Sequence, residues 1–284
     1  MSRSTGILLV TCPDQKGLVA AIANFLVGLS ANILHADQHE DSSSRLFLMR
    51  VEWSLDGTPG LEIFRKKFAP IAEKFSMTWR IEASADPVPA VLFVSKMDHC
   101  LADLLHRHSH GELPSVIKGV VSNHPDTERL VRFYGVPFHL VPVAPDSKVA
   151  SENKQLEILA HAGARLAVLA RYMQVLSTNF LEQFGHPVIN VHHSFLPAFS
   201  GAKPYHRAFE RGVKLIGATS HYVNEDLDDG PIIEQDVMRV SHRDQLDELI
   251  HRGREMEKGV LSRAVLWHAS HRILVYERKT VIFD

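Results

Sequence analysis

The chain has 284 residues, a length that suits one large domain or two ordinary ones. Hydrophobic residues make up 45% of it and charged residues 23%, a balance that allows a buried core and excludes a disordered chain. The formal net charge of -2 argues against a general polyanion binder, so we expect no nucleic-acid partner.

The first residues, the cysteines and the histidines further narrow the class of protein to which the chain can belong. Cys12 and Cys100 lie far apart, which favours a reducing cytoplasm over a disulfide framework. The first residues carry no signal-like apolar region, and no run reaches the roughly 18 apolar residues of a membrane span. His106, His108 and His110 form the tightest histidine cluster, but a spacing of two does not place them on one helix face. We therefore predict a cytoplasmic protein without membrane contact and without a bound metal.

The first 85 residues show a βαββαβ order. Strand patterns at 6–12, 32–39, 46–53 and 77–83 alternate with helical patterns at 18–30 and 61–75. This order is typical of the ferredoxin-like split motif. The unit resembles an ACT domain, whose turn between the first strand and the first helix matches Asp14, Gln15, Lys16 and Gly17. The resemblance implies either a small amino-acid effector at that turn or a role in oligomerisation alone, and both remain open.

Residues 86–89 contain two prolines and are predicted to be a linker. Residues 90–284 are predicted to form a second, Rossmann-like α/β domain with a mostly parallel sheet, because strand and helix patterns alternate there. We expect the strands at 90–95, 116–122, 137–143, 166–170, 188–192, 214–223 and 231–240. The predicted helices are 100–108, 127–134, 151–161, 178–184 and 245–271, and a hairpin at 273–276 and 280–283 closes the chain.

The strand at 188–192 ends in polar residues. Asn190 and His192 share one face of this strand because side chains alternate. An amide donor beside an imidazole suits a carbonyl oxygen that takes on negative charge. The alternative is a polar strand end satisfied by neighbouring backbone groups.

A second polar stretch follows the next strand. Asp226, Asp228 and Asp229 precede Gly230-Pro231, a pattern that is also typical of a solvated turn. We nevertheless predict a functional role for Asp228, because a carboxylate held against His192 would keep the imidazole protonated and could accept a proton from water.

No glycine-rich phosphate motif is present. The turn after the strand at 90–95 reads Ser95-Lys96-Met97-Asp98-His99, and neither G-x-G-x-x-G nor a Walker A sequence occurs anywhere. A dinucleotide cofactor is therefore not expected.

Taken together, the segment 190–197, Gly201 and the segment 227–231 resemble the formyltransferase family that uses 10-formyltetrahydrofolate. The resemblance implies that Asn190, His192 and Asp228 are catalytic. It also implies a folate-binding surface, with folate as substrate rather than cofactor, made of Tyr172, Met173, Gln174, Val175, Leu176, Ser194 and Val223. Gln174 departs from the arginine typical of the ribonucleotide enzymes of this family, which leaves the details of folate contact open.

The ACT-like unit in front, and the missing phosphate turn, resemble the formyltetrahydrofolate deformylase branch over the full length. That resemblance implies a hydrolase in which water attacks the formyl group, releasing formate for one-carbon and purine metabolism. It also implies a homo-oligomer. Two alternatives stay open: a formyltransferase to an amine, and a folate- or amino-acid-sensing module without catalysis.

Basic residues follow Pro197. Lys203, His206, Arg207 and Arg211 are either an ordinary basic surface or a contact for the acidic glutamate tail of folate.

Overall fold

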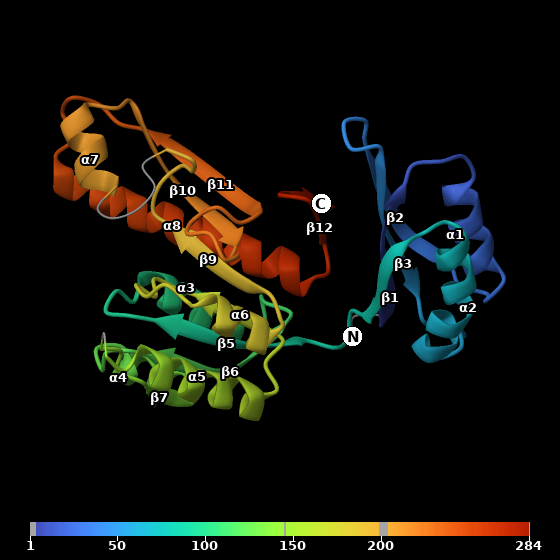
Figure 1. Cartoon of the computed structure of the whole chain (residues 1–284), viewed down its shortest axis with the longest axis horizontal. Coiled ribbons are helices and arrows are strands. Elements are labelled where there is room, and N and C mark those ends of the chain that lie inside the picture. The colour runs from blue at the N-terminus through green and yellow to red at the C-terminus, as the bar shows by residue number, and fades with distance from the viewer. Residues whose placement is uncertain (1–3, 145, 199–203, 284) are drawn as a thin grey trace. The chain divides into compact units, whose positions relative to one another are not determined.

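The computed structural model describes residues 4–144, 146–198 and 204–283. These residues form two compact units (Figure 1), one made of residues 1–87 with 270–284 and one of residues 88–269. The domain prediction differs from this division at two places. Strand β5 (Val88–Val94) already begins inside the expected linker, and residues 270–284 group with the first unit rather than the second.

The first unit has the predicted βαββαβ order, which is confirmed. Its sheet has the order β2-β3-β1-β4 and is antiparallel at every pairing. The elements are β1 (Thr5–Pro13), α1 (Leu18–Val27), β2 (Ile33–Asp41), β3 (Leu46–Ser54), α2 (Leu61–Lys74) and β4 (Thr78–Ala83).

Both faces of β1 are buried, and this explains why the C-terminal hairpin joins the first unit. Leu8 and Val10 face α1 and α2. The alternate residues Ile7 and Leu9 pack against Leu274, Tyr276 and Phe283 of the terminal segment. The hairpin consists of β12 (Ile273–Tyr276) and β13 (Lys279–Ile282). A strand that is apolar on both faces needs a second cover, and the hairpin supplies it.

The second unit is an α/β fold around a seven-stranded sheet of order β11-β10-β9-β8-β5-β6-β7. Strands β5 to β9 pair in parallel, whereas β10 runs antiparallel to both β9 and β11. The mostly parallel sheet is therefore confirmed. Its strands are β5, β6 (Ser115–Ser122), β7 (Phe138–Leu140), β8 (Leu166–Leu169), β9 (Val188–His192), β10 (Leu215–Tyr222) and β11 (Ile232–Arg239).

Helices cover this sheet. They are α3 (His99–Ser109), α4 (Glu128–Phe133), α5 (Lys148–Ala162), α6 (Thr178–Phe184), α7 (Pro204–Arg211) and α8 (Leu246–Ala269). Figure 1 shows α8 lying along β10 and β11, and it also packs against α3 and α7. Helices α5 and α6 pack on Val91 and Phe93 of the central strand. Each fully buried side chain of this size stabilises the fold by about 2 kcal/mol.

No helix in the described part of the chain is both long enough and apolar enough to traverse a lipid bilayer.

Candidate active site

Polar residues at the C-terminal end of β9 lie close to residues of the segment that follows β10. Asn190 and His192 lie on one face of β9, as the alternation predicts. Strand β10 pairs antiparallel with β9, so that His221 is opposite Asn190 and Thr219 is opposite His192. The chain then turns back after β10, and this turn brings Asp228 next to His192.

His192 and Asp228 form a buried pair. The Nδ1 atom of His192 lies 3.1 Å from Oδ2 of Asp228, and both side chains are almost fully buried. The other ring nitrogen, Nε2, is buried and has no hydrogen-bond partner among the described residues. Since the carboxylate holds one side of the ring, Nε2 is the ring nitrogen left for a ligand, as an acceptor in the neutral imidazole and as a donor in the protonated one.

Asn190 is oriented by a second histidine, His221. Nδ1 of His221 lies 2.9 Å from the carbonyl oxygen of Tyr222, which can only accept, so Nδ1 carries the hydrogen. Burial lowers the pKa of His221, although the hydrogen bond to Tyr222 acts in the opposite direction. The neutral ring therefore accepts from Nδ2 of Asn190 at 3.2 Å. This contact fixes the amide and leaves its second N–H available.

The turn that carries Asp228 depends on two backbone features. Asp228 has a φ of 56°, a left-handed conformation that aspartate tolerates better than most residues. Gly230 packs so tightly that a Cβ there would lie 1.8 Å from the carbonyl oxygen of Tyr222. The backbone N–H of Tyr222 also donates to the carbonyl of Pro231 at 2.9 Å. The Gly-Pro pair thus fastens the turn to the end of β10.

A cavity of about 230 Å³ opens beside these residues. Asn190, His192 and Asp228 line its polar end, and the predicted folate-binding residues Tyr172, Met173, Gln174, Val175, Leu176 and Val223 all line its walls. Met173, Val175 and Leu227 expose more than half of their surface at its rim. An exposed apolar rim around a polar end is typical of a ligand site.

The loop between β8 and α6 is fixed at both ends. The backbone N–H of Met173 donates to Oγ of Ser95 at 2.9 Å. At the other end, the buried carboxylate of Glu152 accepts from the backbone N–H and the hydroxyl of Ser177. Ser177 in turn caps α6. The cavity wall is therefore held in place before any ligand binds.

Ser194 does not belong to this cavity. Its hydroxyl donates to the carbonyl of Ala198 at 2.7 Å, and its carbonyl accepts from Thr219. It lines a second, apolar cavity of about 330 Å³ together with His193, Phe195 and Tyr205. The prediction that Ser194 contacts folate is not supported by this position, because the residue follows the bend after β9.

The basic residues after Pro197 lie only partly within the described chain. Arg207 and Arg211 are exposed on α7, and His206 is half-buried there. Lys203 and Gly201 lie outside the described residues. None of the described three lines the reaction cavity.

The predicted regulatory turn in the first unit has the expected backbone. Gly17 has a φ of 95°, in the left-handed region that favours glycine. Asp14, Gln15 and Gly17 line a cavity of about 440 Å³ with Gln38 and Glu40 of β2, whereas Lys16 does not line it.

Four polar residues near the site were not predicted. His193 and Arg171 line the reaction cavity, His221 orients Asn190, and Glu257 binds Arg171 from α8. His221 could have been predicted from the sequence, because it lies near the end of the predicted strand 214–223, which leads into the acidic turn. Nothing in the sequence brings Glu257, 86 residues after Arg171, to the same place.

Comparisons with known proteins agree with this architecture. A profile of the formyl transferase family matches residues 89–265. The chain is similar to the formyltetrahydrofolate deformylase of Synechocystis, with 51% identity over the whole of both chains. It superposes on the crystal structure of a formyltetrahydrofolate deformylase from Pseudomonas syringae with a TM-score of 0.97 and 48% identity, covering 100% of this chain and 96% of the other.

A more distant likeness covers part of the chain. Glycinamide ribonucleotide transformylase 1 from Symbiobacterium toebii superposes with a TM-score of 0.66 and 27% identity, covering 70% of this chain and 95% of that one.

Proposed function

Because the chain belongs to the formyl transferase family, among the formyltetrahydrofolate deformylases, we propose that it hydrolyses 10-formyltetrahydrofolate to formate and tetrahydrofolate. One observation carries this assignment to the site. His192 is held by Asp228 through Nδ1 while its Nε2 remains without a partner in the described structure, beside Asn190 in the same cavity. Two donors thus converge where a formyl oxygen would gain charge.

The hydrolysis proceeds by attack of water on the formyl carbon. Asn190 and the protonated His192 donate to the oxyanion of the tetrahedral intermediate, and a donor of this kind typically lowers the barrier by about 3 kcal/mol. Asp228 accepts the proton of the water, directly or through a second water. The bond between the formyl carbon and the folate nitrogen then breaks, and that nitrogen takes up a proton.

The folate rings occupy the apolar part of the cavity. Its volume of about 230 Å³ lies below the roughly 300–1,000 Å³ of pockets that enclose a drug-sized ligand, so the rest of the molecule stays outside. The exposed side chains of Met173, Val175 and Leu227 offer apolar cover to the part that enters. The basic residues of α7 are proposed to contact the acidic glutamate tail of the folate.

The first unit is proposed to be an ACT domain. The cavity at Gly17 carries two carboxylates, Asp14 and Glu40, which suit the ammonium group of a small amino acid. Strand β2 is an edge strand of the sheet, and most of its residues are exposed. An exposed edge strand favours pairing with a second copy of the chain. The enzyme would then be a cytoplasmic homo-oligomer that supplies formate for one-carbon and purine metabolism.

Incubation of the full-length protein with 10-formyltetrahydrofolate alone tests the function. We expect equal amounts of formate and tetrahydrofolate to be released without any amine present. Formylation of an added amine with no formate in its absence would favour a transferase. Binding of the folate without release of formate would favour a sensing module and contradict the proposal.

A further inference from the structure

The sheet of the second unit has a switch point between β5 and β8. From β5 the chain crosses first to β6 and β7 on one side and later to β8 on the other. Ligands of open α/β sheets bind beyond the carboxyl ends of the strands at such a point. Here the two loops are joined, because the backbone N–H of Ser95 donates to the carbonyl of Arg171 at 3.2 Å.

A large side chain occupies this point at a backbone position that favours glycine. Arg171 has a φ of 64°, where side chains other than glycine are strained. Its side chain is nevertheless only 13% exposed, and Nε lies 3.3 Å from Oε2 of Glu257. A strained, buried arginine is retained only where its surroundings hold it firmly.

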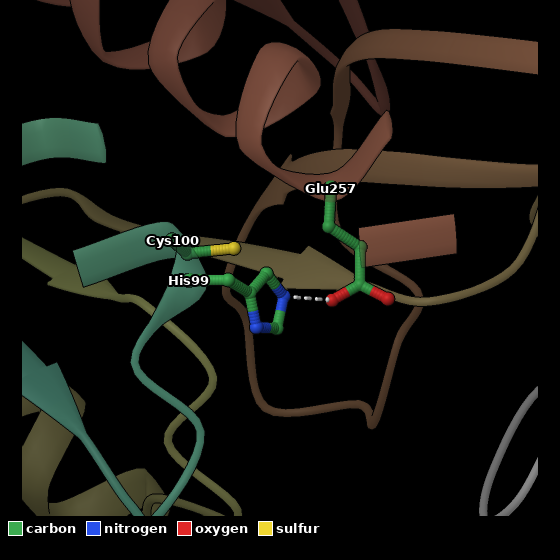
Figure 2. A group of neighbouring side chains, drawn as sticks. All are labelled: His99, Cys100 and Glu257. Carbon is green, nitrogen blue, oxygen red and sulfur yellow. Dashed lines mark hydrogen bonds and ion pairs between the residues drawn. The ribbon is translucent and has the colours of Figure 1, made fainter. Parts of the chain in front are cut away.

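Glu257 is the centre of those surroundings. His99, the first residue of α3 after β5, is joined to Glu257 (Figure 2), and its Nε2 lies 2.8 Å from Oε2. The hydroxyl of Tyr205 donates to Oε1 at 2.9 Å. Burial alone would raise the pKa of Glu257, but the hydrogen bond with His99 and the charge of Arg171 outweigh it and lower this pKa. The carboxylate is therefore ionised and fully engaged.

Helix α8 is adapted to this arrangement. A Cβ on Gly253 would lie 2.1 Å from the ring of Tyr205. Glycine in the middle of a helix is unfavourable, so its presence one turn before Glu257 is explained by the close approach of Tyr205. The space made by Gly253 lets the Tyr205 hydroxyl reach the carboxylate.

The same residues could instead suggest a metal site, since the sulfur of Cys100 lies within 4.8 Å of the ligand atoms of His99 and Glu257 (Figure 2). Three facts oppose it. Both oxygens of Glu257 already accept hydrogen bonds, the Arg171 guanidinium contacts the oxygen that a cation would need, and burial raises the pKa of the Cys100 thiol well above its usual value. A cation would meet an arginine and a protonated thiol there.

We propose that Arg171, paired with the Glu257 carboxylate that His99 and Tyr205 hold in place, fills the position of a second substrate at the switch point, so that only water reaches the formyl carbon. Arg171 lines the reaction cavity together with Asn190, His192 and Asp228, so an amine entering from the β5–β8 side would meet its side chain. This inference rests on the proposed function and adds the residue that determines which acceptor is used.

The two reactions differ only in the acceptor. In the hydrolysis, the oxygen of water bonds to the formyl carbon, the bond from that carbon to the folate nitrogen breaks, and formate, a proton and tetrahydrofolate leave. In the transfer, the nitrogen of a primary amine forms the bond instead, and a proton of the amine passes to the folate nitrogen. The products are then a formamide and tetrahydrofolate.

The test uses the full-length Arg171→Gly variant with 10-formyltetrahydrofolate and increasing concentrations of glycinamide as the probe amine. Formate and N-formylglycinamide are both quantified. We expect the ratio of formamide to formate to rise about tenfold or more over that of the natural sequence, which should yield almost no formamide. Arg171→Met, which refills the space without the charge, should keep the low ratio.

Arg45→Gly is the matched control. Arg45 is also an arginine at positive φ, 55°, but it is exposed in the turn between β2 and β3 of the first unit. Its replacement relieves the same backbone strain and should leave the ratio unchanged.

Three outcomes would overturn the inference. They are an unchanged ratio in an Arg171→Gly variant that still releases formate, a high ratio in Arg171→Met, and formylation of glycinamide by the natural sequence. The last does not depend on the folding of any variant. If the natural sequence releases no formate at all, the proposed function itself fails, and that result is separate from these three.

Discussion

Asp228 and His192 lie in different segments but are joined through one ring nitrogen at 3.1 Å. In the proposed reaction Asp228 both holds the charged imidazole and accepts a proton, and an amide performs neither task. We expect Asp228→Asn to reduce kcat by about 100-fold or more, as the removal of a group that stabilises the transition state typically does. The variant should still bind the folate. Steady-state kinetics together with equilibrium binding of tetrahydrofolate would measure both effects.

The neighbouring acid provides the control for that variant. Asp229 is exposed and does not line the cavity, so Asp229→Asn should keep nearly full turnover. Substantial activity in Asp228→Asn, or an equal loss in both variants, would contradict the role given to Asp228.

We expect His193 to make the stability of the protein sensitive to acid. Burial, and after it the charge of Arg171, lowers the pKa of His193 from 6.5 to about 3. Between these values the unfolded chain binds a proton that the folded chain does not, so the free energy of unfolding falls as the pH falls below about 6.5. The contribution is fully present above that pH. We expect the natural sequence to lose about 2 kcal/mol more than His193→Asn between about pH 6.5 and 4.5, measured by urea unfolding.

An exposed histidine serves as the comparison for this experiment. His186→Asn changes a side chain at the surface, so its stability should follow that of the natural sequence across the same range. Parallel curves for His193→Asn and the natural sequence would show that the buried ring is not the source of the acid sensitivity.

At the level of the elements, α8 contains two interior glycines with opposite surroundings. A Cβ on Gly253 would lie 2.1 Å from the Tyr205 ring, whereas a Cβ on Gly259 would meet only the flexible end of Arg263 at 3.3 Å. We expect Gly253→Ala to destabilise the protein by about 2 kcal/mol or more through overpacking. Gly259→Ala should stabilise it by up to about 1 kcal/mol through helix propensity. Thermal unfolding of the two variants would compare them, and a shift of the same sign in both would refute the packing argument.

The elements themselves were largely predictable from the sequence, because period-two and helical patterns report burial directly. The strand at 188–192 was found with its limits, and the alternation correctly placed Asn190 and His192 on one face. The pairing of β10 antiparallel to β9, which brings His221 to Asn190, depends on tertiary context that the pattern does not contain.

Other features of the site have the same origin. The family resemblance implies that Ser194 contacts folate, and in the structure the chain bends after His192 so that the Ser194 hydroxyl donates to the carbonyl of Ala198. Arg171 and Glu257 are paired only through folding, and neither belongs to a motif whose spacing would announce the contact. The hairpin was predicted, but its burial against Ile7 and Leu9 could not be read from its own residues.

At the scale of the whole molecule, the first unit is built from both ends of the chain. The hairpin buries Leu274 and Phe283 on the N-terminal sheet, and the hydroxyl of Tyr276 donates to Asp41 at 2.9 Å. We expect a fragment of residues 1–87 to be unstable and prone to aggregation, because the face of Ile7 and Leu9 would be exposed. Joining residues 270–284 to that fragment through a flexible linker should restore cooperative unfolding. Circular dichroism would measure the unfolding transition of both forms.

A linked fragment with Leu274→Ala gives the matching negative case, since removal of one buried leucine costs about 2–5 kcal/mol. If the fragment 1–87 alone unfolds as cooperatively as the linked form, the hairpin is not needed for the first unit.

The split construction of the first unit also sets an order on biosynthesis. A chain emerging from the ribosome presents strands β1 to β4 early, yet the segment that covers one side of them is translated only after the whole second unit. Residues 88–269 are complete earlier and are free to collapse while the opening segment waits with apolar side chains in water. Molecular chaperones would therefore be needed most by the first part of this polypeptide, although its four-stranded sheet is smaller than the seven-stranded sheet of the second unit.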